Sequence, residues 1–598
     1  MIKVSDYIAK RLTEHGISDV FMISGGGAMH LNDSLGNHPK LKYWTNHHEQ
    51  ACAIAAEGYY RASGKMAVVN VTSGPGGLNC LTGVMGQWTD SIPALYLSGQ
   101  VKYETTIYSC KELGLRQLGD QEVDIISVVK SLTKYSAVLE NPDDVKKMLD
   151  KAIFIANSGR KGPVWIDIPL NVQAAMIDEL KLNDSDNDSA IDDSKPNSIL
   201  LVRNIDKVVQ LILSSKRPVI IAGHGIRLSE GEEAFKQLVD KIAVPVVTTF
   251  NGMDLIPTDH PNYAGRIGTL GNRSGNFTLQ NADLVLCLGS RNNIRQVSYN
   301  WPNFAHKAVK IVVDIDQAEL NKPTVKPDIP ILADIRHFCE ILSERLLTEP
   351  VPDFSSWMKW TKERLLKYPS VLSEYRNTNS IHPYYFVKRL TELLGSESIL
   401  VAANGTACVV AFQASIVKEG SRMFWNSGCA AMGYDLPASI GASIARGGKE
   451  VICLAGDGSI QMNIQELQTL KQFNLPIKIF YLNNDGYISI RQTQDKFFEG
   501  RKVACDRTSG VSFPDFIKLA KAYDLPSVSI STTSDIDNKL ENILKQSGPV
   551  LCEVILSNDY IFSPKVTSEK LPDGRMISKP LEDMFPFLDR NEYNSNLL

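Results

Sequence analysis

Two short apolar runs, each followed by small and polar residues, constrain the fold of this chain most strongly. Val451–Leu454 leads into Gly456-Asp457-Gly458-Ser459, and Ile477–Leu482 leads into Asn483-Asn484-Asp485-Gly486. Short apolar runs of this kind are typical of buried strands in a parallel sheet. Between them, residues 461–473 carry apolar side chains at helical spacing. The order strand, turn, helix, strand predicts polar groups at the carboxyl ends of two strands, where open α/β sheets bind ligands.

The residues at these two strand ends have the chemistry of a magnesium and phosphate site. Asp457 and Asn484 offer oxygen ligands of the kind that Mg²⁺ prefers, with phosphate oxygens completing its shell. Gly456 and Gly458 let the backbone approach a ligand closely, and the free N–H groups that open the following helix suit a phosphate. The alternative is a plain tight turn, but the second polar strand end favours a clamp that holds a metal and a diphosphate.

Composition limits the other possibilities. At 598 residues, the chain is expected to hold about three domains. A net charge of −4 gives no indication of nucleic acid or an anionic membrane as partner. The ten cysteines form no C-x-x-C pair. The first residues lack the apolar core of a signal peptide, and no apolar run reaches the length of a membrane span, so we expect a cytoplasmic protein.

The first third predicts an α/β domain over residues 1–182. A helix of mostly small residues begins near Glu49, whose charge gains from the helix dipole. Residues 68–79 predict a buried strand and a glycine-rich turn into a helix, and residues 93–100 another strand. The alternative for Glu49 is a simple helix-terminal charge or an interhelical salt bridge.

The remaining chain divides by composition. Polar, acidic residues 183–198 predict a linker, and strands alternating with helices predict a doubly wound central domain over residues 199–345. In that domain Gly223-His224-Gly225 follows a strand, which indicates either a weak phosphate loop or a plain turn. Residues 346–380 predict a helical connector, residues 381–562 a third α/β domain, and residues 563–598 a tail that covers the site as a lid or packs on a neighbouring subunit.

The Gly456-Asp457-Gly458…Asn483-Asn484 pattern resembles the thiamine diphosphate signature of the superfamily that contains decarboxylases and acetolactate synthase. The block from His47 to Tyr59, followed by Ser73-Gly74-Pro75-Gly76, is similar to the pyrimidine-binding domain of acetolactate synthase-like enzymes. The likeness extends in order from residue 1 to about residue 590. It implies three doubly wound α/β domains (pyrimidine-binding, central nucleotide-type and diphosphate-binding), with thiamine diphosphate and Mg²⁺ as cofactors.

The resemblance also implies individual roles. Glu49 is the glutamate expected to be buried beside the aminopyrimidine, where a carboxylate promotes loss of the thiazolium C2 proton. Met432 props the cofactor into its bent shape, and Gln121 faces the substrate. Asp457, Asn484 and Gly486 are expected to hold the metal. The expected cofactor-binding residues are Glu49, Thr72, Asn79, Asn404, Gly405, Thr406, Ala430, Met432, Gly456, Asp457, Gly458, Ser459, Asn484, Gly486, Tyr487 and Ile488.

This chain departs from the acetolactate synthase pattern on the acceptor side. Asp120 stands where those enzymes have Phe, Ser489 where they have Met, and Thr493 where they have Trp. With Gly26 and Gly27, these residues form the expected acceptor pocket. Because small polar side chains replace large apolar ones, we expect a bulky, hydroxylated acceptor such as a keto sugar nucleotide.

The central domain of acetolactate synthases holds FAD, and that of other relatives holds ADP or nothing. Arg291 matches the flavin-contacting arginine, but the residues after it depart from the G-x-R-F-D-D-R pattern. FAD therefore stays an expectation. Its candidate contacts are Gly223, Gly225, Arg291, Asp316 and Asp334.

The resulting hypothesis is a carboligase that decarboxylates a 2-oxo acid, pyruvate first among them, and transfers the two-carbon unit to a carbonyl acceptor. Acetolactate synthase proper and a simple 2-oxo acid decarboxylase are alternatives, although the His-His pair of the decarboxylases does not follow the glycine-rich strand here. A nucleotide-binding or redox protein is the alternative from another class, and no G-x-G-x-x-G after a strand supports it. In this family Glu49 and Asp457 come from two chains, which implies a homodimer or a dimer of dimers.

Overall fold

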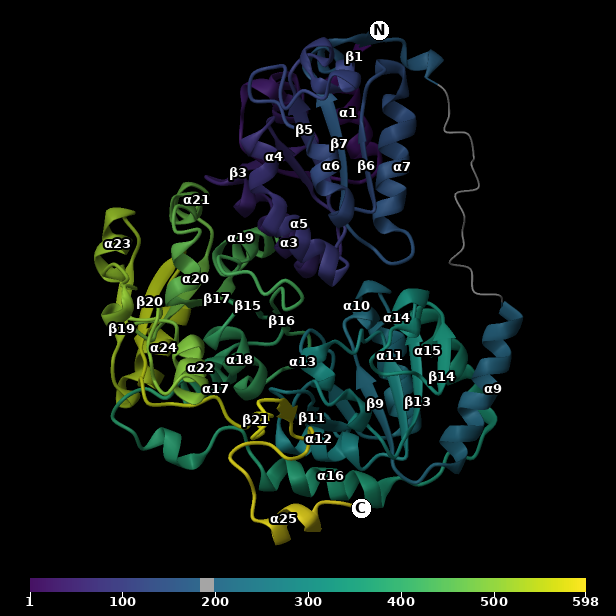
Figure 1. Cartoon of the computed structure of the whole chain (residues 1–598), viewed down its shortest axis with the longest axis vertical. Helices are drawn as coiled ribbons and strands as arrows, with labels where there is room; N and C mark the ends of the chain where they lie inside the picture. The colour runs from purple at the N-terminus through teal and green to yellow at the C-terminus, as the bar shows by residue number, and fades with distance from the viewer. Residues whose placement is uncertain (183–197) are drawn as a thin grey trace.

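A computed structural model describes residues 1–182 and 198–598. The described residues form three six-stranded parallel sheets, one in each predicted α/β domain (Figure 1). The prediction of three doubly wound α/β domains is confirmed. The predicted linker at residues 183–198 lies outside the described residues except for Ser198, which begins a helix.

The N-terminal sheet has the strand order β3-β2-β4-β5-β7-β6. After the predicted last strand, β8 (Met176–Ile177) pairs antiparallel with β1 (Ile2–Lys3) and so ties the two ends of the domain together. The sheet strands are β2 (Asp19–Met22), β3 (Lys42–Thr45), β4 (Val68–Val71), β5 (Leu95–Gln100), β6 (Tyr135–Val138) and β7 (Val164–Pro169). The helices are α1 (Val4–Glu14), α2 (Met29–Asn37), α3 (Glu49–Ser63), α4 (Pro75–Asn79), α5 (Leu81–Asp90), α6 (Ile125–Val129), α7 (Val145–Asn157) and α8 (Leu170–Ala174).

The central sheet has the order β11-β10-β9-β12-β13-β14, which is the dinucleotide-binding order 3-2-1-4-5-6. Its strands are β9 (Pro218–Ala222), β10 (Val246–Thr248), β11 (Tyr263–Arg266), β12 (Leu284–Leu288), β13 (Val309–Asp314) and β14 (Ile329–Leu332). Its helices are α9 (Ser198–Ser214), α10 (Gly225–Leu228), α11 (Glu232–Ile242), α12 (Arg273–Gln280), α13 (Ile294–Val297), α14 (Gln317–Asn321) and α15 (Ile335–Arg345), followed by α16 (Ser355–Lys367) in the connector.

The C-terminal sheet, β16-β15-β17-β18-β20-β19, repeats the topology of the N-terminal one. Its strands are β15 (Ile399–Ala402), β16 (Arg422–Phe424), β17 (Val451–Gly456), β18 (Ile477–Asn483), β19 (Ser527–Ile530) and β20 (Val550–Ile555). Its helices are α17 (Pro383–Leu393), α18 (Thr406–Ala414), α19 (Asp435–Ala445), α20 (Asp457–Gln461), α21 (Glu466–Gln472), α22 (Ile488–Phe497), α23 (Phe516–Ala522) and α24 (Ile536–Lys545). The helix predicted over residues 461–473 begins only at Glu466, because Gln461 ends the short helix α20 and the chain turns across residues 462–465.

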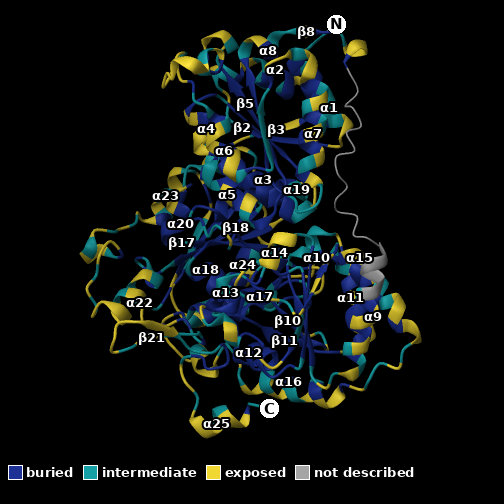
Figure 2. Cartoon of the chain, turned by 45° about the vertical axis from the view of Figure 1, so that its right-hand side comes forward, coloured by how far each residue is buried: buried dark blue, intermediate teal, exposed yellow. Residues whose placement is uncertain are grey.

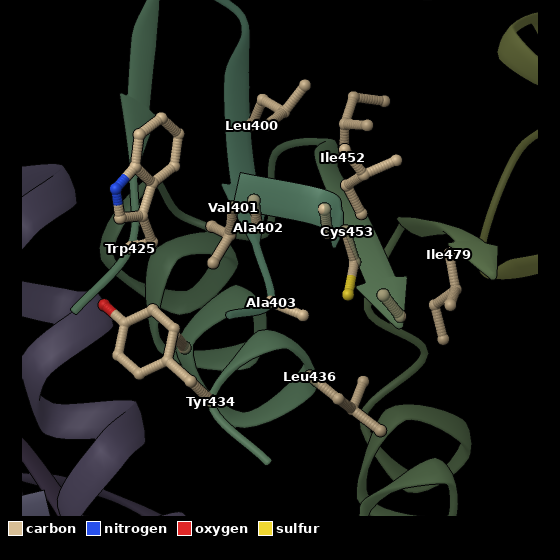
Figure 3. Packing of buried hydrophobic residues seen from close by; sticks show 14 of the residues in the cluster. Leu400, Val401, Ala402, Ala403, Trp425, Tyr434, Leu436, Ile452, Cys453 and Ile479 are labelled. Atoms are coloured by element: carbon tan, nitrogen blue, oxygen red, sulfur yellow. The ribbon is translucent and has the colours of Figure 1, made fainter. Parts of the chain in front are cut away.

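The inner strands of the three sheets are buried, whereas the edge strand β3 is mostly exposed and β6 is half-buried (Figure 2). In the C-terminal domain, the paired residues Leu400 and Ile452 lie on one face of the sheet and Cys453 on the other, while Trp425 and Tyr434 lie at the edge of the core nearest the N-terminal helices (Figure 3). No helix in the described part of the chain is both long and apolar enough to cross a membrane.

Helices α3 and α19 join the N-terminal and C-terminal domains by direct backbone contact. A Cβ atom on Gly58 would lie 2.7 Å from the carbonyl carbon of Ala438, and one on Gly441 would lie 2.7 Å from that of Ala55. Only glycine permits this approach. Because α3 carries Glu49 at its first residue, this contact also positions the predicted catalytic glutamate.

The C-terminal tail runs from the C-terminal domain onto the central domain (Figure 1). Gln413 donates a hydrogen bond to the carbonyl of Pro564, 2.6 Å away, and Asn276 donates to that of Leu581, 2.9 Å away. The tail contains a small hairpin, β21 (Ser568–Lys570) with β22 (Met576–Ser578), and ends in α25 (Arg590–Ser595). Its first residues thus lie next to the predicted site, and the rest packs on this chain's own central domain.

Candidate active site

The Asp457 carboxylate lies where β17 ends and α20 begins, and it is nearly fully buried. It accepts hydrogen bonds from the backbone N–H groups of Gly458, at 2.9 Å, Asn484, at 3.0 Å, and Gly486, at 3.1 Å. Burial raises the pKa of Asp457 to about 6, although these hydrogen bonds oppose the rise. A nearby cation would stabilise a carboxylate that is so poorly solvated. The burial of Asp457 is therefore consistent with the predicted metal site.

Asn484 completes the clamp and is held by a residue that the sequence analysis missed. Its side-chain oxygen accepts a hydrogen bond from the Tyr560 hydroxyl, 2.7 Å away, and that hydroxyl lies 3.2 Å from the hydroxyl of Thr406. Arg491 donates to the backbone carbonyl of Asn484 at 2.6 Å. Tyr560 follows β20 without any recognisable motif, so only the fold brings it to the clamp.

Two glycines of the clamp, Gly458 and Gly486, are required by the packing of the protein itself. A Cβ atom on Gly458 would lie 2.9 Å from a ring carbon of Tyr487, and Gly486 has a φ of 140° with the Cys505 carbonyl against it. A Cβ on Gly456 would meet little. Close approach of a ligand was expected at Gly456 and Gly458, and at Gly458 the missing side chain also makes room for the Tyr487 ring.

The loops from β15 and before α19 meet beside the clamp. Gly405 has a φ of 93°, and α18 begins at Thr406 without a side-chain cap. Asn404 donates to the Asn426 side chain and to the Ala431 carbonyl, both at 2.7 Å, while its own buried Oδ1 has no partner among the described residues. The Asn404 side chain therefore orders the loop that leads to Met432.

Met432 itself is half-buried and lies outside the hydrophobic core clusters of the described residues. Ala430, before it, has a φ of 57°, a conformation that favours glycine. Ser459 accepts a hydrogen bond from the N–H of Gly433 at 2.8 Å, and so ties this loop to α20. The alternative that Met432 is ordinary core filler is not supported.

In the N-terminal domain, the predicted pyrimidine site comes together around the ends of β2 and β4. Glu49 is the first residue of α3, and its carboxylate accepts a hydrogen bond from Asn79 at 2.9 Å. Thr72 accepts one from the N–H of Gly27 at 3.0 Å. Glu49 is half-buried in the single chain, which corrects the expectation of a buried carboxylate.

The buried glutamate of α3 is Glu57, which the sequence analysis did not single out. Its carboxylate accepts hydrogen bonds from Arg61 at 2.8 Å and from the Tyr434 hydroxyl at 3.1 Å, and Arg61 also pairs with Asp90 at 2.6 Å. Burial raises the pKa of Glu57 to about 7, against the lowering effect of Arg61. This network links the N-terminal domain to the start of α19. The i, i+4 spacing of Glu57 and Arg61 was the available signal.

The predicted acceptor residues are dispersed in the single chain. Gln121 has a φ of 62° and an exposed side chain, and its backbone packs against Gly74. Asp120 is exposed too, as is Gly26. Ser489 and Thr493 share one face of α22, where the Thr493 hydroxyl donates to the Ser489 carbonyl at 3.0 Å.

The central domain has a cavity of about 410 Å³ at the carboxyl ends of its strands. Gly223 and Gly225 lie against the backbone of Gly289, so neither tolerates a side chain. Arg291, Gly225 and Asp334 line the cavity, together with Asp314, whose pKa burial raises to about 6.

Two of the predicted flavin residues have local structural roles. Asp316 caps α14 and pairs with Arg160 at 2.7 Å, and it does not line the cavity. Asp334 caps α15 while also lining the cavity. The sequence analysis missed Asp314, the last residue of β13, two residues before Asp316.

The Glu49 cluster and the clamp are not joined by any hydrogen bond among residues 1–182 and 198–598. The start of α3 instead contacts the turn between α20 and α21. Gln50 accepts a hydrogen bond from Asn463 at 2.9 Å, and Glu466 accepts one from Asn46 at the same distance. Each chain thus presents two separate parts of a site.

Comparisons with known proteins agree with this geometry. Residues 2–127, 205–342 and 403–554 match the N-terminal TPP binding domain, the central domain and the C-terminal TPP binding domain of thiamine pyrophosphate enzymes. The acetolactate synthase large subunit of Lactococcus lactis subsp. lactis (strain IL1403) is 32% identical, over 99% of this chain and 98% of its own. That of Cyanidium caldarium is 31% identical over 94% of each chain, and the chloroplastic acetolactate synthase 1 of Zea mays is 31% identical over 95% of this chain and 87% of its own. The chain therefore belongs to the thiamine pyrophosphate enzyme family, as a relative of the acetolactate synthase large subunits.

Proposed function

We propose that this protein is a carboligase that decarboxylates a 2-oxo acid, pyruvate in the first instance, and transfers the two-carbon acyl unit to a bulky, hydroxylated carbonyl acceptor. Family membership supports the thiamine diphosphate chemistry. The observation that carries the choice of acceptor is the pair Ser489 and Thr493 on α22, directly after the clamp, where small polar side chains leave room.

The residues present fit the cofactor and a metal. Asp457, Asn484 and the carbonyl of Gly486 would hold Mg²⁺, and the poor solvation of Asp457 favours a cation there. No cluster of three or more His, Cys, Asp or Glu side chains occurs in the described ranges, so the cofactor's phosphates would complete the metal's shell. Thiamine diphosphate supplies a nucleophilic carbon and an electron sink when bound. Glu49, held by Asn79, would hold the proton at the pyrimidine nitrogen.

A complete site requires two chains in this proposal. Glu49 is half-buried at the domain surface and the clamp lies in another domain, so a partner subunit would bring the two parts together. Sedimentation of the active protein tests this, and an active monomer would contradict it.

The central cavity supports a further cofactor proposal. We propose FAD as its occupant, with Gly225, Arg291 and Asp334 in the cavity wall. A purified protein that lacks flavin absorbance, and whose activity is unchanged by added FAD, would refute this assignment.

The acceptor proposal is tested with Thr493→Trp, which restores a large apolar side chain on α22. We expect turnover of keto sugar nucleotides to fall at least about tenfold, because the indole fills the space beside the clamp. A variant of Asp495 would be a poor control, because Asp495 forms an ion pair with Lys502 that the substitution would break. The control is Lys521→Trp, which adds the same group at an exposed position of α23. Unchanged turnover of large acceptors by the Thr493 variant would sink the argument.

Acetolactate synthase is the second candidate, because the relatives that cover the chain carry that name at about 31% identity. The two candidates are separated by identifying the products formed at a constant pyruvate concentration with each member of a panel of acceptors. Formation of 2-acetolactate as the main product in every case favours the second candidate. Recovery of activity by the apoenzyme with NAD, but not with thiamine diphosphate and Mg²⁺, would exclude both.

A further inference from the structure

A second cavity, of about 720 Å³, lies directly beside the clamp. Tyr560 lines it and also donates to Asn484 of the clamp, while Ile488, another lining residue, begins α22. A cavity of this size accommodates a ligand far larger than a 2-oxo acid. The tail supplies part of the wall through Lys565, Thr567 and Phe585.

One face of α22 supplies the opposite wall. The lining residues of this helix are Ile488, Arg491, Gln492, Asp495 and Lys496, which recur at the i, i+3, i+4 spacing of a single helix face. Ser489 and Thr493 lie on the adjacent face, which connects this cavity to the proposed acceptor side.

The cavity is cationic. Its wall contains Arg491, Lys496, Lys502 and Lys565 against the two acids Asp495 and Asp559. Lys502 is neutralised by Asp495. Neither Lys496 nor Lys565 has an ion pair within the described chain, and the exposed Asp559 pairs with neither.

Lys565 is held firmly despite having no counter-ion. Its backbone exchanges two hydrogen bonds with Phe585, at 2.9 and 2.7 Å, and its ammonium group donates to the Gln492 side chain at 3.3 Å. Burial is the main cause that lowers the pKa of Lys565, and the positive charge of Lys496 lowers it further. Two neighbouring ammonium groups repel one another unless an anion lies between them.

We propose that Lys496 and Lys565 bind a phosphate or diphosphate group of the carbonyl acceptor. The inference rests on the proposed function and names the chemical class of its acceptor. A phosphate ester supplies the missing negative charge, and the volume of the cavity leaves room for the group to which it is attached. The carboxylate of a second 2-oxo acid would leave most of that space empty.

The test measures binding of UDP and of uridine to the full-length holoenzyme, by equilibrium dialysis with thiamine diphosphate and Mg²⁺ in excess. The wild-type protein is expected to bind UDP at least about tenfold more tightly than uridine. In the double variant Lys496→Gln and Lys565→Gln, the Kd for UDP should rise by roughly tenfold or more per lysine. The matched control, Lys518→Gln with Lys545→Gln, removes two surface lysines that pair with their own helix neighbours and should leave UDP binding unchanged.

Equal UDP binding by the wild-type protein and the cavity variant overturns the inference, as does absence of UDP binding to the wild-type protein. If the cavity variant instead requires more pyruvate for saturation while UDP binding is unaltered, the lysines serve a carboxylate and the inference is wrong. A wild-type protein that consumes no pyruvate with any acceptor refutes the proposed function alone, because the dialysis result decides the role of the lysines independently.

Discussion

The contact between α3 and α19 leads to a quantitative prediction for Gly441→Ala. A Cβ atom at this position would lie 2.7 Å from the carbonyl carbon of Ala55 and 2.9 Å from the backbone nitrogen of Tyr59. The Ala55 carbonyl oxygen lies closer still, and because favourable carbon contacts need about 3.5 Å or more, the two helices must separate by at least about 0.8 Å. The obstructing atoms are backbone, which no rotamer change can move away.

The cost follows from two opposing effects. Overpacking of this kind costs about 1–3 kcal/mol. We expect a cost near the upper end of this range for Gly441→Ala, because the obstructing atoms belong to rigid backbone. Alanine gains at most about 1 kcal/mol over glycine inside a helix. The net loss of about 2 kcal/mol corresponds to a fall in the unfolding midpoint of about 4–8 °C for a unit of 150–250 residues.

Scanning calorimetry of the apoprotein measures this shift. Gly36→Ala is the matched control, because Gly36 also lies in a helix but its Cβ would approach only Tyr43, at 3.8 Å. The control should be as stable as the wild-type protein or slightly more so. If Gly441→Ala unfolds within about 1 °C of the wild-type protein, the close approach of α3 to α19 is refuted.

Three further predictions concern the site and its supporting residues. Asp457→Asn should fold but lose Mg²⁺-dependent binding of thiamine diphosphate by about 100-fold, measured calorimetrically; wild-type affinity would remove Asp457 from the clamp. Glu49→Gln should bind the cofactor yet lose nearly all pyruvate turnover, and wild-type-like activity would contradict its assignment. Asp167 is fully buried, accepting hydrogen bonds from Ser98 at 2.5 Å and Gln100 at 3.2 Å, and burial raises its pKa to about 7. Because its folded pKa lies above the usual value, its contribution to stability is full below about pH 4 and is lost as the pH rises through 7. The free energy of unfolding of the wild-type protein, relative to that of Asp167→Asn, should therefore fall by up to about 4 kcal/mol across that window. Urea unfolding at several pH values measures this difference. A difference that stays constant with pH would show that Asp167 is not poorly solvated.

Local patterns in the sequence determined the architecture and the local parts of the site. Apolar runs and helical spacing are properties of neighbouring residues, so β17, β18 and the polar groups at their ends could be predicted. The prediction of Glu49 at the start of α3 succeeded for the same reason. The single helix expected over residues 461–473 failed because the chain turns back toward α3, where Glu466 and Asn463 meet the other domain.

Tertiary structure alone decided which distant residues meet. Tyr560 reaches Asn484, Tyr434 reaches Glu57, and Lys565 of the tail faces α22, and no local periodicity encodes any of these contacts. Burial, likewise, depends on what packs above a residue. That is why Glu57 is buried in the single chain, while Glu49, on the same helix, is not.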